Sequence, residues 1–343
     1  MNQSNLDRMM TVPKFVGEGK IEYGEKEIPS PGPGQLLIAV KANALCGSDR
    51  WQFQHGTEIV PGHEAAGIVA QAGPGTKTPI GAQGVVFLMG YCGSCRNCVS
   101  DLSNLCLNKR ADYGFSHDGG YAPYITVNEN VFFETDPSLP LTEATMLLDI
   151  MGTGGHAIKR GQKVIPVIQS SVVAGAGPIG LGVAAMMKLL LGDIPVLVTD
   201  YNEYRLNLAA KLGAIPVDLS RESLTDVTRS SGLDGFDLAV DTSGKTEARH
   251  IMLKSLRKPG ALVCVGHGEA LNLKVSEDLI ATERTVLGSE YFRYEDLQAN
   301  HELIKEHLDY LRPIITHRYS LGELQKAYEI FFKGNTGKVI IEQ

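Results

Sequence analysis

The sequence predicts an α/β protein with two domains, a β-rich first half and a doubly wound parallel sheet after it. The chain of 343 residues is longer than one ordinary core requires and fits two domains. Before residue 141, short apolar runs end at Gly or Pro, and long helical periods are few. After it, strand-like runs alternate with helical stretches, which is typical of parallel strands joined by right-handed helical crossovers.

The strands expected in the first half are short and bounded by turn residues. "SPGPGQ" (30–35) reads as a turn because Pro and Gly interrupt regular backbone. The runs on either side are apolar or alternate with period two, as half-buried strands do. The expected strands are "QLLIAVKANA" (35–44), "AAGIVAQAG" (65–73), "QGVVFLMG" (83–90) and "GYAPYITVNENVFFE" (120–134).

The second half begins with a helical stretch at 141–161 and continues as an alternation of strands and helices. The strands are "SVVAGAG", "IPVLVTD", "FDLAVDTSG" and "GALVCVGHG". The helices between them are "GLGVAAMMKLLLG", "NEYRLNLAAKLGA" and "TEARHIMLKSLRKPG". The tail adds two helices, 295–311 and 320–334, and the closing strand "GKVII".

Composition and charge exclude several classes of protein. Hydrophobic residues make up 43% and charged residues 21%, which is typical of a soluble globular chain. The net charge is −7 and the Lys and Arg residues are scattered, so no surface for a nucleic acid is expected. The N-terminus lacks the apolar core of a secretory signal, and no run of eighteen apolar residues occurs. We expect a cytoplasmic protein that binds no membrane.

A glycine-rich turn predicts a dinucleotide site. Gly175, Gly177 and Gly180 form G-x-G-x-x-G between a strand and a helix, and Asp200 ends the next strand. The glycines allow a tight turn and a close approach of pyrophosphate to the helix N-terminus. Asp200 would bind the ribose hydroxyls and favour NAD over NADP, a preference that Arg205 could soften. The alternative is a glycine turn in an α/β domain that binds no nucleotide. The residues expected to bind the cofactor at this turn are Gly175, Gly177, Pro178, Ile179 and Gly180.

Four cysteines predict a structural metal. Cys92, Cys95, Cys98 and Cys106 have the spacing C-x2-C-x2-C-x7-C, which brings four thiolates to one tetrahedral ion. Such a site has no open position for substrate, so we expect a structural zinc in a lobe at about 91–107. An iron–sulfur cluster, a disulfide or redox switch, and unligated thiols are the alternatives.

The evidence for a second set of metal ligands is weaker when it rests on spacing alone. Cys46 lies in "NALCGSD", and His63 and Glu64 lie in "PGHEAAG". These segments, the cysteine lobe, "DGGYAPYITV", "GAGPIGLG", "VTDYNEYRL" and "GKVII" occur in the order typical of the zinc-dependent medium-chain alcohol dehydrogenases. The chain resembles that family from about residue 20 to residue 341, over a specific set of motifs.

The resemblance implies a fold. A GroES-like catalytic domain would be formed by residues 1–149 and 290–343, and a Rossmann NAD-binding domain by residues 150–289. A catalytic zinc would face the nicotinamide, in addition to the structural zinc. A homodimer or homotetramer is expected, with the sheet-edge region 262–266 and the residues after it as a candidate interface.

The resemblance also implies roles for individual residues. Cys46 and His63 would bind the catalytic zinc, with Asp149 as the third ligand unless it is only a helix-capping carboxylate. Glu64 would be a fourth or exchanging ligand, or would act only from outside the ligand shell. Ser48 would pass on the alcohol proton unless it is a simple turn serine. The residues expected beside the nicotinamide are Thr153, Val265, Gly266 and His267.

One position departs from the family. Trp51 stands where many members have the histidine that ends the proton relay. Ribose hydroxyls and water would then end the relay, with Arg50 or His55 as substitutes. Trp51, Leu88 and the polar "QFQH" (52–55) would line the substrate pocket, in line with a secondary alcohol or polyol.

These expectations lead to one function and two alternatives. We expect a zinc-dependent oxidoreductase that transfers a hydride between a secondary alcohol, polyol or cyclitol and NAD. The alternatives are a zinc-dependent aldehyde or ketone reductase, and a scaffold of the same fold that binds nucleotide or senses zinc without catalysis.

Overall fold

The computed structural model describes residues 9–343, which divide into two compact units. Unit 1 comprises the chain up to Leu148 together with His317–Lys333 and Lys338–Gln343, and unit 2 comprises Asp149–Thr316 and Gly334–Gly337. The first eight residues, on which part of the expectation about a secretory signal rests, lie outside the description. The predicted domain limits, with 290–343 in the first domain, stay a prediction.

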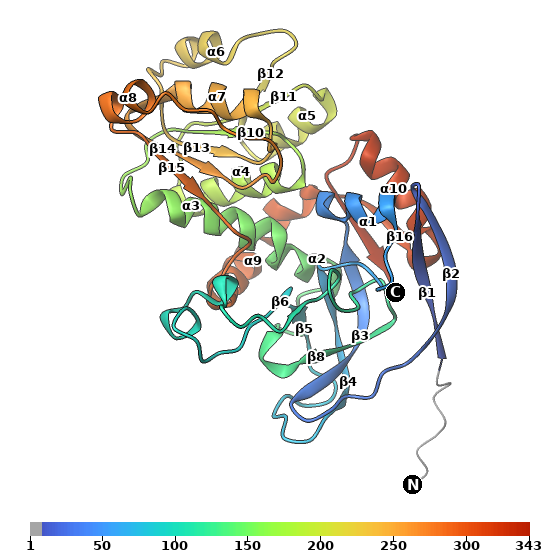
Figure 1. Cartoon of the computed structure of the whole chain (residues 1–343). Helices are drawn as coiled ribbons and strands as arrows, with labels where there is room; N and C mark the ends of the chain where they lie inside the picture. The colour runs from blue at the N-terminus through green and yellow to red at the C-terminus, as the bar shows by residue number, and fades with distance from the viewer. Residues whose placement is uncertain (1–8) are drawn as a thin grey trace. The chain divides into compact units, whose positions relative to one another are not determined.

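Unit 1 is built on a mixed set of short strands, as the β-rich first half predicts. Seven strands form a sheet in the order β16-β17-β3-β4-β5-β9, with β8 paired to β3, and β1 and β2 form a separate antiparallel ribbon (Figure 1). The bounds are β1 Met9–Gly17, β2 Lys20–Glu27, β3 Gln35–Ala44, β4 Ala65–Ala72, β5 Gln83–Val86, β8 Tyr124–Asn128, β9 Phe132–Glu134, β16 Ile315–Ser320 and β17 Lys338–Glu342.

The helices of unit 1 are few and short. They are α1 Arg50–His55, α2 Leu141–Ala144 and α10 Leu324–Lys333. Helix α10 is amphipathic and buries one apolar stripe, which contains Leu324, Ala327, Tyr328 and Phe331. The lobe around the four cysteines has two 3-10 turns, Cys98–Ser100 and Ser103–Leu105, and the short strands β6 Met89–Gly90 and β7 Ala111–Asp112 pair at its base.

Unit 2 contains the parallel sheet that the alternating pattern predicts. Its six strands have the order β12-β11-β10-β13-β14-β15, and the strand order reverses at β10 (Figure 1). The bounds are β10 Ser171–Ala174, β11 Val196–Asp200, β12 Ile215–Asp218, β13 Phe236–Asp241, β14 Leu256–Cys264 and β15 Thr285–Gly288. The central strands β10 and β13 are buried along almost their whole length because helices cover both faces.

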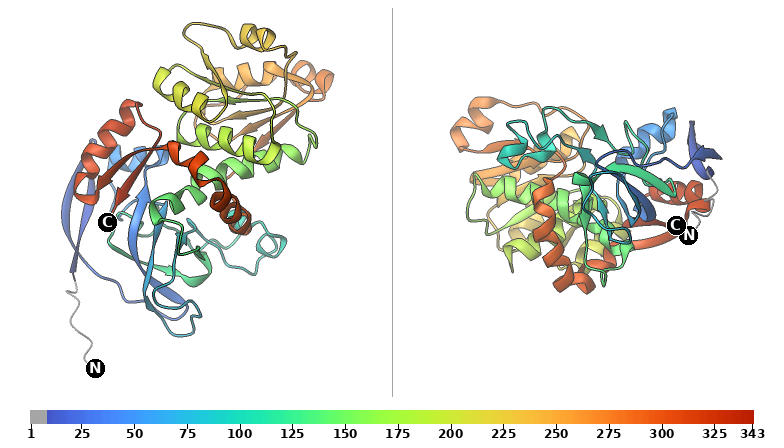
Figure 2. Two further views of the ribbon diagram at one scale, coloured as in Figure 1. Left: turned by 180° about the vertical axis from the view of Figure 1, so that it is seen from behind. Right: turned by 90° about the horizontal axis from the view of Figure 1, so that it is seen from below.

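The helices of unit 2 lie on the two faces of this sheet. Helices α3 and α4 cover one face and α7 covers the other (Figures 1 and 2). On the α7 face, Val172, Phe236 and Leu262 of the sheet pack with Met252 and Leu253 of the helix in one buried cluster. The bounds are α3 Gly154–Gln162, α4 Pro178–Leu191, α5 Glu203–Lys211, α6 Leu224–Ser230, α7 Thr246–Ser255, α8 Val275–Asp278 and α9 Leu297–Leu311.

The helical stretch predicted at 141–161 is interrupted. It consists of α2, a 3-10 turn at Thr145–Leu147, a π-helical turn at Asp149–Thr153 and then α3. The π turn packs closely on its surroundings, since a Cβ at Gly152 would lie 2.5 Å from the Phe292 ring. Single π turns occur often at functional sites, and this one begins at a predicted zinc ligand.

The sheet edge differs from the expectation. The region 262–266 is not an edge, because β14 is hydrogen-bonded to β13 on one side and to β15 on the other. The edge strands are β12 and β15, and β15 follows a loop and two short helical turns that the sequence pattern did not reveal as the approach to a strand. Within residues 9–343, no helix is both long and apolar enough to cross a membrane.

Candidate active site and cofactor-binding residues

Three strand ends bring distant segments of unit 1 together. Strands β3 and β4 pair with Asn43 opposite Ala65, so Cys46 follows one strand where His63 and Glu64 precede the other. The backbone continues this contact, since the Ala44 N–H donates to the Glu64 carbonyl at 3.2 Å. Strand β17 pairs with the other side of β3, which places its first residue, Lys338, at the same end.

Four side chains at this end form a metal-binding group. One donor atom each from Cys46, His63, Glu64 and Asp149 lies within 4.8 Å of the other three. Cys46 is half-buried and the other three are buried. Asp149 begins the π turn and directly follows Leu148, the last residue of the first segment of unit 1. Thiolate, imidazole and carboxylate are the ligand types of zinc, so the donor set fits that ion.

A buried carboxylate orients the imidazole of this group. The His63 Nδ1–H donates to Asp49 Oδ1 at 3.1 Å, and Asp49 is completely buried. This bond fixes the tautomer, so the other ring nitrogen, Nε2, is left as the metal ligand. Asp49 closes the 3-10 turn that begins directly after Cys46, which explains how one short segment supplies both a ligand and the partner of another ligand.

Two phenols in turn hold Asp49. The Tyr328 hydroxyl donates to Asp49 Oδ2 at 2.7 Å, and the Tyr121 hydroxyl lies 3.4 Å from the same oxygen. The two hydroxyls lie 3.0 Å apart. Burial, followed by the charge of Asp49, raises the pKa of both tyrosines well above 10. Both phenols therefore stay protonated and act as donors to the carboxylate.

Glu64 has a cationic partner within unit 1. The Lys338 Nζ forms an ion pair with Glu64 Oε1, and both side chains are fully buried. A buried charge is stable only when it is paired, so each of these groups depends on the other. The pair connects the closing strand of the chain to a candidate zinc ligand.

The structure corrects part of the prediction about which residues line the substrate pocket. Ser48 is exposed in the turn after Cys46, and Trp51 is 65% exposed and stacks on His55 with ring centroids 4.8 Å apart. Gln52, by contrast, is buried and donates to the Gly114 carbonyl at 2.9 Å, because the short helix α1 turns it toward the interior. Of the polar "QFQH" segment, only Gln54 and His55 are exposed. Leu88 is buried, with 8% of its surface exposed.

The second group consists of the four lobe cysteines. One sulfur from each of Cys92, Cys95, Cys98 and Cys106 lies within 4.8 Å of the others, and none of the cysteines in residues 9–343 forms a disulfide. The Cys92 and Cys98 sulfurs are 3.9 Å apart, close to the separation of about 3.8 Å that tetrahedral Zn–S bonds of about 2.3 Å require. The disulfide alternative therefore has no support in this geometry.

The lobe backbone is arranged for thiolates. The N–H groups of Cys92, Cys95 and Leu107 point at sulfurs of the cluster at 3.2 to 3.4 Å. Backbone donors at Ser94 and Cys95 lower the pKa of the Cys92 thiol to about 5. Burial, and the neighbouring thiols, raise the pKa of Cys98 to about 12. A divalent cation held by these four sulfurs would supply the charge that lets them ionise together.

The glycine turn of unit 2 has the geometry expected of a dinucleotide site. Gly175 has φ +93°, a conformation that favours glycine, and Gly177 is the N-cap of α4, with Pro178 as its first residue. A Cβ at Gly180 would lie only 1.8 Å from the Gly175 carbonyl, so the helix can start here only with glycine. Ile179 follows Pro178 in the first helical turn, where unpaired N–H groups favour an anion.

Asp200 lies next to this turn. Strands β10 and β11 pair in register at Ala174 and Thr199, and Asp200 Oδ2 accepts a hydrogen bond from the Ala176 N–H at 2.6 Å. Asp200 and Gly175 line a cavity of about 390 Å³. The Arg205 side chain donates to the Thr336 carbonyl at 3.3 Å, and burial lowers the pKa of its guanidinium although the charge of Asp200 opposes the shift.

The other predicted cofactor residues lie in unit 2 as well. Val265 and Gly266 follow β14, and their N–H groups donate to the carbonyl of Asp241 at the end of β13. His267 is exposed and lies 3.7 Å from Glu290. Thr153 is buried at the end of the π turn. The structure thus places the glycine turn and the pair Val265 and Gly266 at the carboxyl ends of β10 and β14, the two neighbours of β13, at the edge where ligands of doubly wound sheets bind.

Comparison with known proteins identifies the family. Residues 32–137 match the model of the alcohol dehydrogenase GroES-like domain, and residues 178–306 match the zinc-binding dehydrogenase model. The L-threonine 3-dehydrogenase of Colwellia psychrerythraea is 33% identical over 97% of this chain and 99% of its own length. The chain belongs to the zinc-dependent medium-chain alcohol dehydrogenases. The predicted fold class, with a GroES-like domain and a Rossmann-type parallel sheet, is confirmed.

Solved structures have the same fold. The alcohol dehydrogenase of Thermus sp. ATN1 superposes with a TM-score of 0.88, is 26% identical and covers 97% of this chain and 99% of its own. An alcohol dehydrogenase of Escherichia coli solved with NADH gives a TM-score of 0.88 over 98% of this chain and 100% of its own, and at 21% identity it shows the fold alone.

As a medium-chain dehydrogenase of this family, the protein is an NAD-dependent zinc enzyme. Zinc belongs to the four-cysteine group and to the group that contains Cys46, His63 and Glu64, and NAD is the cofactor. The non-catalytic scaffold and the iron–sulfur cluster are therefore set aside.

Sequence reasoning missed the residues that support the zinc ligands. Asp49, Tyr121, Tyr328 and Lys338 are all buried and touch a candidate ligand or its partner. Asp49 stands three residues after Cys46, Tyr121 lies in "DGGYAPYITV" and Lys338 lies in "GKVII", so three of them were inside segments already singled out. Nothing in the local sequence distinguishes Tyr328 from the apolar residues that it follows and precedes on α10.

Proposed function

We propose that this medium-chain dehydrogenase oxidises a secondary alcohol, with a polyol, cyclitol or 2-amino-3-hydroxy acid as the substrate class, to a ketone with NAD+. The observation that carries the proposal is the group of Cys46, His63, Glu64 and Asp149, whose donors are close enough to share one ion. Relatives named L-threonine 3-dehydrogenase support the secondary alcohol, because the 3-hydroxyl of threonine is one.

We assign Cys46, His63 and Asp149 as the metal ligands, and Glu64 as a fourth or exchanging ligand. Zinc, when bound, acts as a Lewis acid on the alcohol oxygen, and NAD+ accepts the hydride from the carbon. One thiolate and one carboxylate balance the two charges of the ion, and Lys338 balances Glu64. The pairing with Lys338 supports a role for Glu64 outside the resting ligand shell.

Ser48 is the proposed acceptor of the alcohol proton. Ser48 is exposed and lies two residues after Cys46, which supports this role. The proton then leaves through ribose hydroxyls and water, because tryptophan at position 51 cannot carry it. His55 is a poorer substitute, since its Nδ1 is hydrogen-bonded to the Trp51 carbonyl at 2.9 Å, and Arg50 lies over the Phe332 ring at 4.1 Å. The products are a ketone, NADH and a proton.

On the cofactor side, Asp200 is proposed to bind the adenosine ribose and to favour NAD over NADP. Gly175, Gly177, Pro178, Ile179 and Gly180 would hold the pyrophosphate, with Arg205 beside them. Thr153, Val265, Gly266 and His267 would lie beside the nicotinamide. We also propose a homo-oligomer, for which the edge strand β15 is now the candidate surface.

A substrate panel tests this proposal. The zinc-loaded protein is mixed with NAD+ or NADP+ and with L-threonine, butane-2,3-diol, sorbitol, myo-inositol or a primary alcohol, and absorbance of the reduced nicotinamide is followed. We expect oxidation of at least one secondary alcohol with NAD+, and a lower kcat/KM for primary alcohols and for NADP+. Reduction of aldehydes with NADPH, without oxidation of any member of the panel, would establish the reductase alternative instead.

A further inference from the structure

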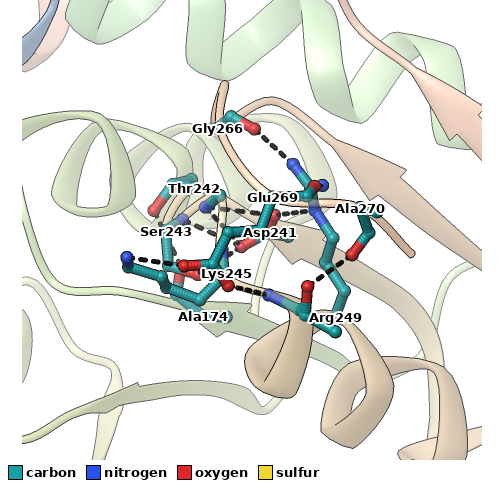
Figure 3. Close-up of polar contacts among 11 residues, drawn as sticks. Ala174, Asp241, Thr242, Ser243, Lys245, Arg249, Gly266, Glu269 and Ala270 are labelled. Atoms are coloured by element: carbon teal, nitrogen blue, oxygen red, sulfur yellow. Dashed lines mark hydrogen bonds and ion pairs between the residues drawn. The ribbon is translucent and has the colours of Figure 1, made fainter. Parts of the chain in front are cut away.

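A buried ion pair in unit 2 joins the two loops that follow β13 and β14. Asp241, the last residue of β13, is completely buried, and Arg249 of α7 is 8% exposed. The Arg249 Nε–H donates to Asp241 Oδ2 at 2.8 Å. The other carboxylate oxygen accepts from the N–H and the hydroxyl of Ser243 at 2.8 and 2.6 Å (Figure 3). The charge of Asp241 is therefore fully compensated inside the protein.

The same guanidinium reaches the second loop. Its Nη2 donates to the Gly266 carbonyl at 2.5 Å, and its Nη1 donates to the Glu269 carbonyl (Figure 3). One planar side chain thus fixes the end of β13 and two points of the loop after β14. A lysine in its place could keep the bond to Asp241 but could not make all three contacts, because its ammonium is a single point of charge without the fork of a guanidinium.

Backbone contacts bring the two loops against each other. The Glu269 N–H donates to the Gly244 carbonyl at 2.8 Å, and a Cβ at Gly266 would lie 2.4 Å from the Gly244 nitrogen. At the outer end, Lys245 forms an ion pair with the Glu269 side chain at 2.8 Å, and the Thr246 hydroxyl donates to the Ala270 carbonyl at 2.6 Å. The two loops therefore form one hydrogen-bonded body with Arg249 at its centre.

This body forms part of the wall of the cofactor site. Ser243, Lys245 and Glu269 line the cavity of about 390 Å³ together with Asp200, whereas Arg249 is not among the lining residues. Val265 and Gly266, proposed above to lie beside the nicotinamide, belong to the loop that Arg249 holds. A binding loop that is already ordered loses less conformational entropy when a ligand binds.

We infer that Arg249 is a positioning residue for NAD, which sets the loop 265–269 through its bonds to the Gly266 and Glu269 carbonyls without touching the cofactor. The inference rests on the proposed role of residues 265–267. Loss of the guanidinium fork should weaken NADH binding more than AMP binding, because residues 265–267 would contact only the nicotinamide half, whereas the adenosine half also rests on Asp200 and the glycine turn, which Arg249 does not contact.

The test is the affinity of the full-length zinc-loaded protein for NADH and for AMP, measured by fluorescence titration and calorimetry. For Arg249→Lys we expect the Kd of NADH to rise about tenfold and the Kd of AMP to rise less than about threefold. The matched control is Arg257→Lys, the same change at an arginine paired with Asp234 and Asp237 near the amino ends of β13 and β14, and it should leave both affinities unchanged.

Two results would overturn the inference. If the Kd of Arg249→Lys for NADH stays within twofold of the wild-type value, the position of the loop 265–269 does not depend on the guanidinium fork. An equal loss of NADH and AMP affinity shows a general loosening of the unit. If Arg249→Lys does not fold, Thr246→Val replaces it, because it removes only an exposed bond to the same loop. We expect a two- to threefold rise in the NADH Kd for Thr246→Val, and no change would also overturn the inference. Failure of the wild-type protein to bind NADH would instead count against the proposed function.

Discussion

The four thiols of the lobe come from one segment, Cys92–Cys106, whereas the catalytic group takes its donors from the ends of separate strands and from Asp149. The lobe is held by local hydrogen bonds, namely those of two short 3-10 turns, those from backbone N–H groups to sulfur, and one from the Asn97 amide to the Leu105 carbonyl at 2.6 Å. The catalytic group has a buried hydrogen-bond network behind it, made by Asp49, Tyr121 and Tyr328.

This difference indicates how far the structure of each group depends on its metal. In the lobe, zinc has the stabilising role that a hydrophobic core has elsewhere, so binding of the ion and local folding are one event. In the catalytic group, the protein has already placed the ligands, and the ion adds chemistry more than structure. The following predictions test this contrast.

The largest expected effect is on turnover. Cys46→Ser should lower the rate of NAD-dependent alcohol oxidation by about 10³-fold or more, because loss of a thiolate ligand removes several kcal/mol of transition-state stabilisation by the metal. The circular dichroism spectrum and the lobe zinc should not change. A Cys46→Ser enzyme with undiminished turnover, measured by absorbance of NADH, would contradict the assignment of this group as the catalytic centre.

In the lobe, the same substitution should act on structure. Cys106→Ser should weaken zinc binding there by about 10³-fold, since three thiolates remain and folding of the loop is coupled to the metal. Limited proteolysis followed by mass spectrometry should show new cleavage within 91–107. If the variant loses zinc and its lobe resists protease as well as the wild type does, zinc is not what folds the lobe.

A smaller effect, on stability, is expected at the buried ion pair. Lys338→Met should lower the free energy of unfolding by about 3–5 kcal/mol, because it removes the ammonium that pairs with the fully buried Glu64 carboxylate. Urea denaturation of the zinc-loaded protein measures this difference. Glu64→Gln combined with Lys338→Met should recover most of the loss, and purely additive losses would show that the two charges do not depend on each other.

The smallest effect is expected in the hydrogen-bond network that holds Asp49, the partner of His63. Tyr328→Phe removes one hydrogen bond to Asp49 and leaves Tyr121 in place, so the loss of stability should be about 1 kcal/mol. The retention of catalytic zinc against a chelator should fall several-fold, because groups that orient a ligand tune metal affinity. Lobe zinc serves as the internal control. Equal loss of zinc from both groups would mean that Tyr328 acts on the fold in general.

The sequence was sufficient where a site is local. The lobe and the glycine turn each lie within one short segment, and spacing alone indicated their ligand chemistry. Cys46 and His63 needed the resemblance to a family, because a cysteine and a histidine seventeen residues apart are common without a shared metal. Their proximity depends on the register of β3 and β4, which no local pattern specifies.

The residues that support the zinc ligands could not be predicted from local sequence patterns. Tyr328 and Asp49 are 279 positions apart, and Lys338 and Glu64 are 274 positions apart, so only the complete fold brings them together. The ribbon β1–β2 was also not predicted, because β2 is mostly exposed and lacks the alternation that marks a half-buried strand. The strands β12, β15 and β16 are short and only partly buried, and they gave no clear pattern either.

The most direct test of the central claim is an anomalous difference map from crystals of the zinc-loaded protein, collected at the zinc absorption edge. We predict one peak at about 2.3 Å from the Cys46 sulfur and about 2.0–2.1 Å from His63 Nε2, and a second peak among the four lobe sulfurs. A map with a peak in the lobe and none between Cys46 and His63 would contradict the account.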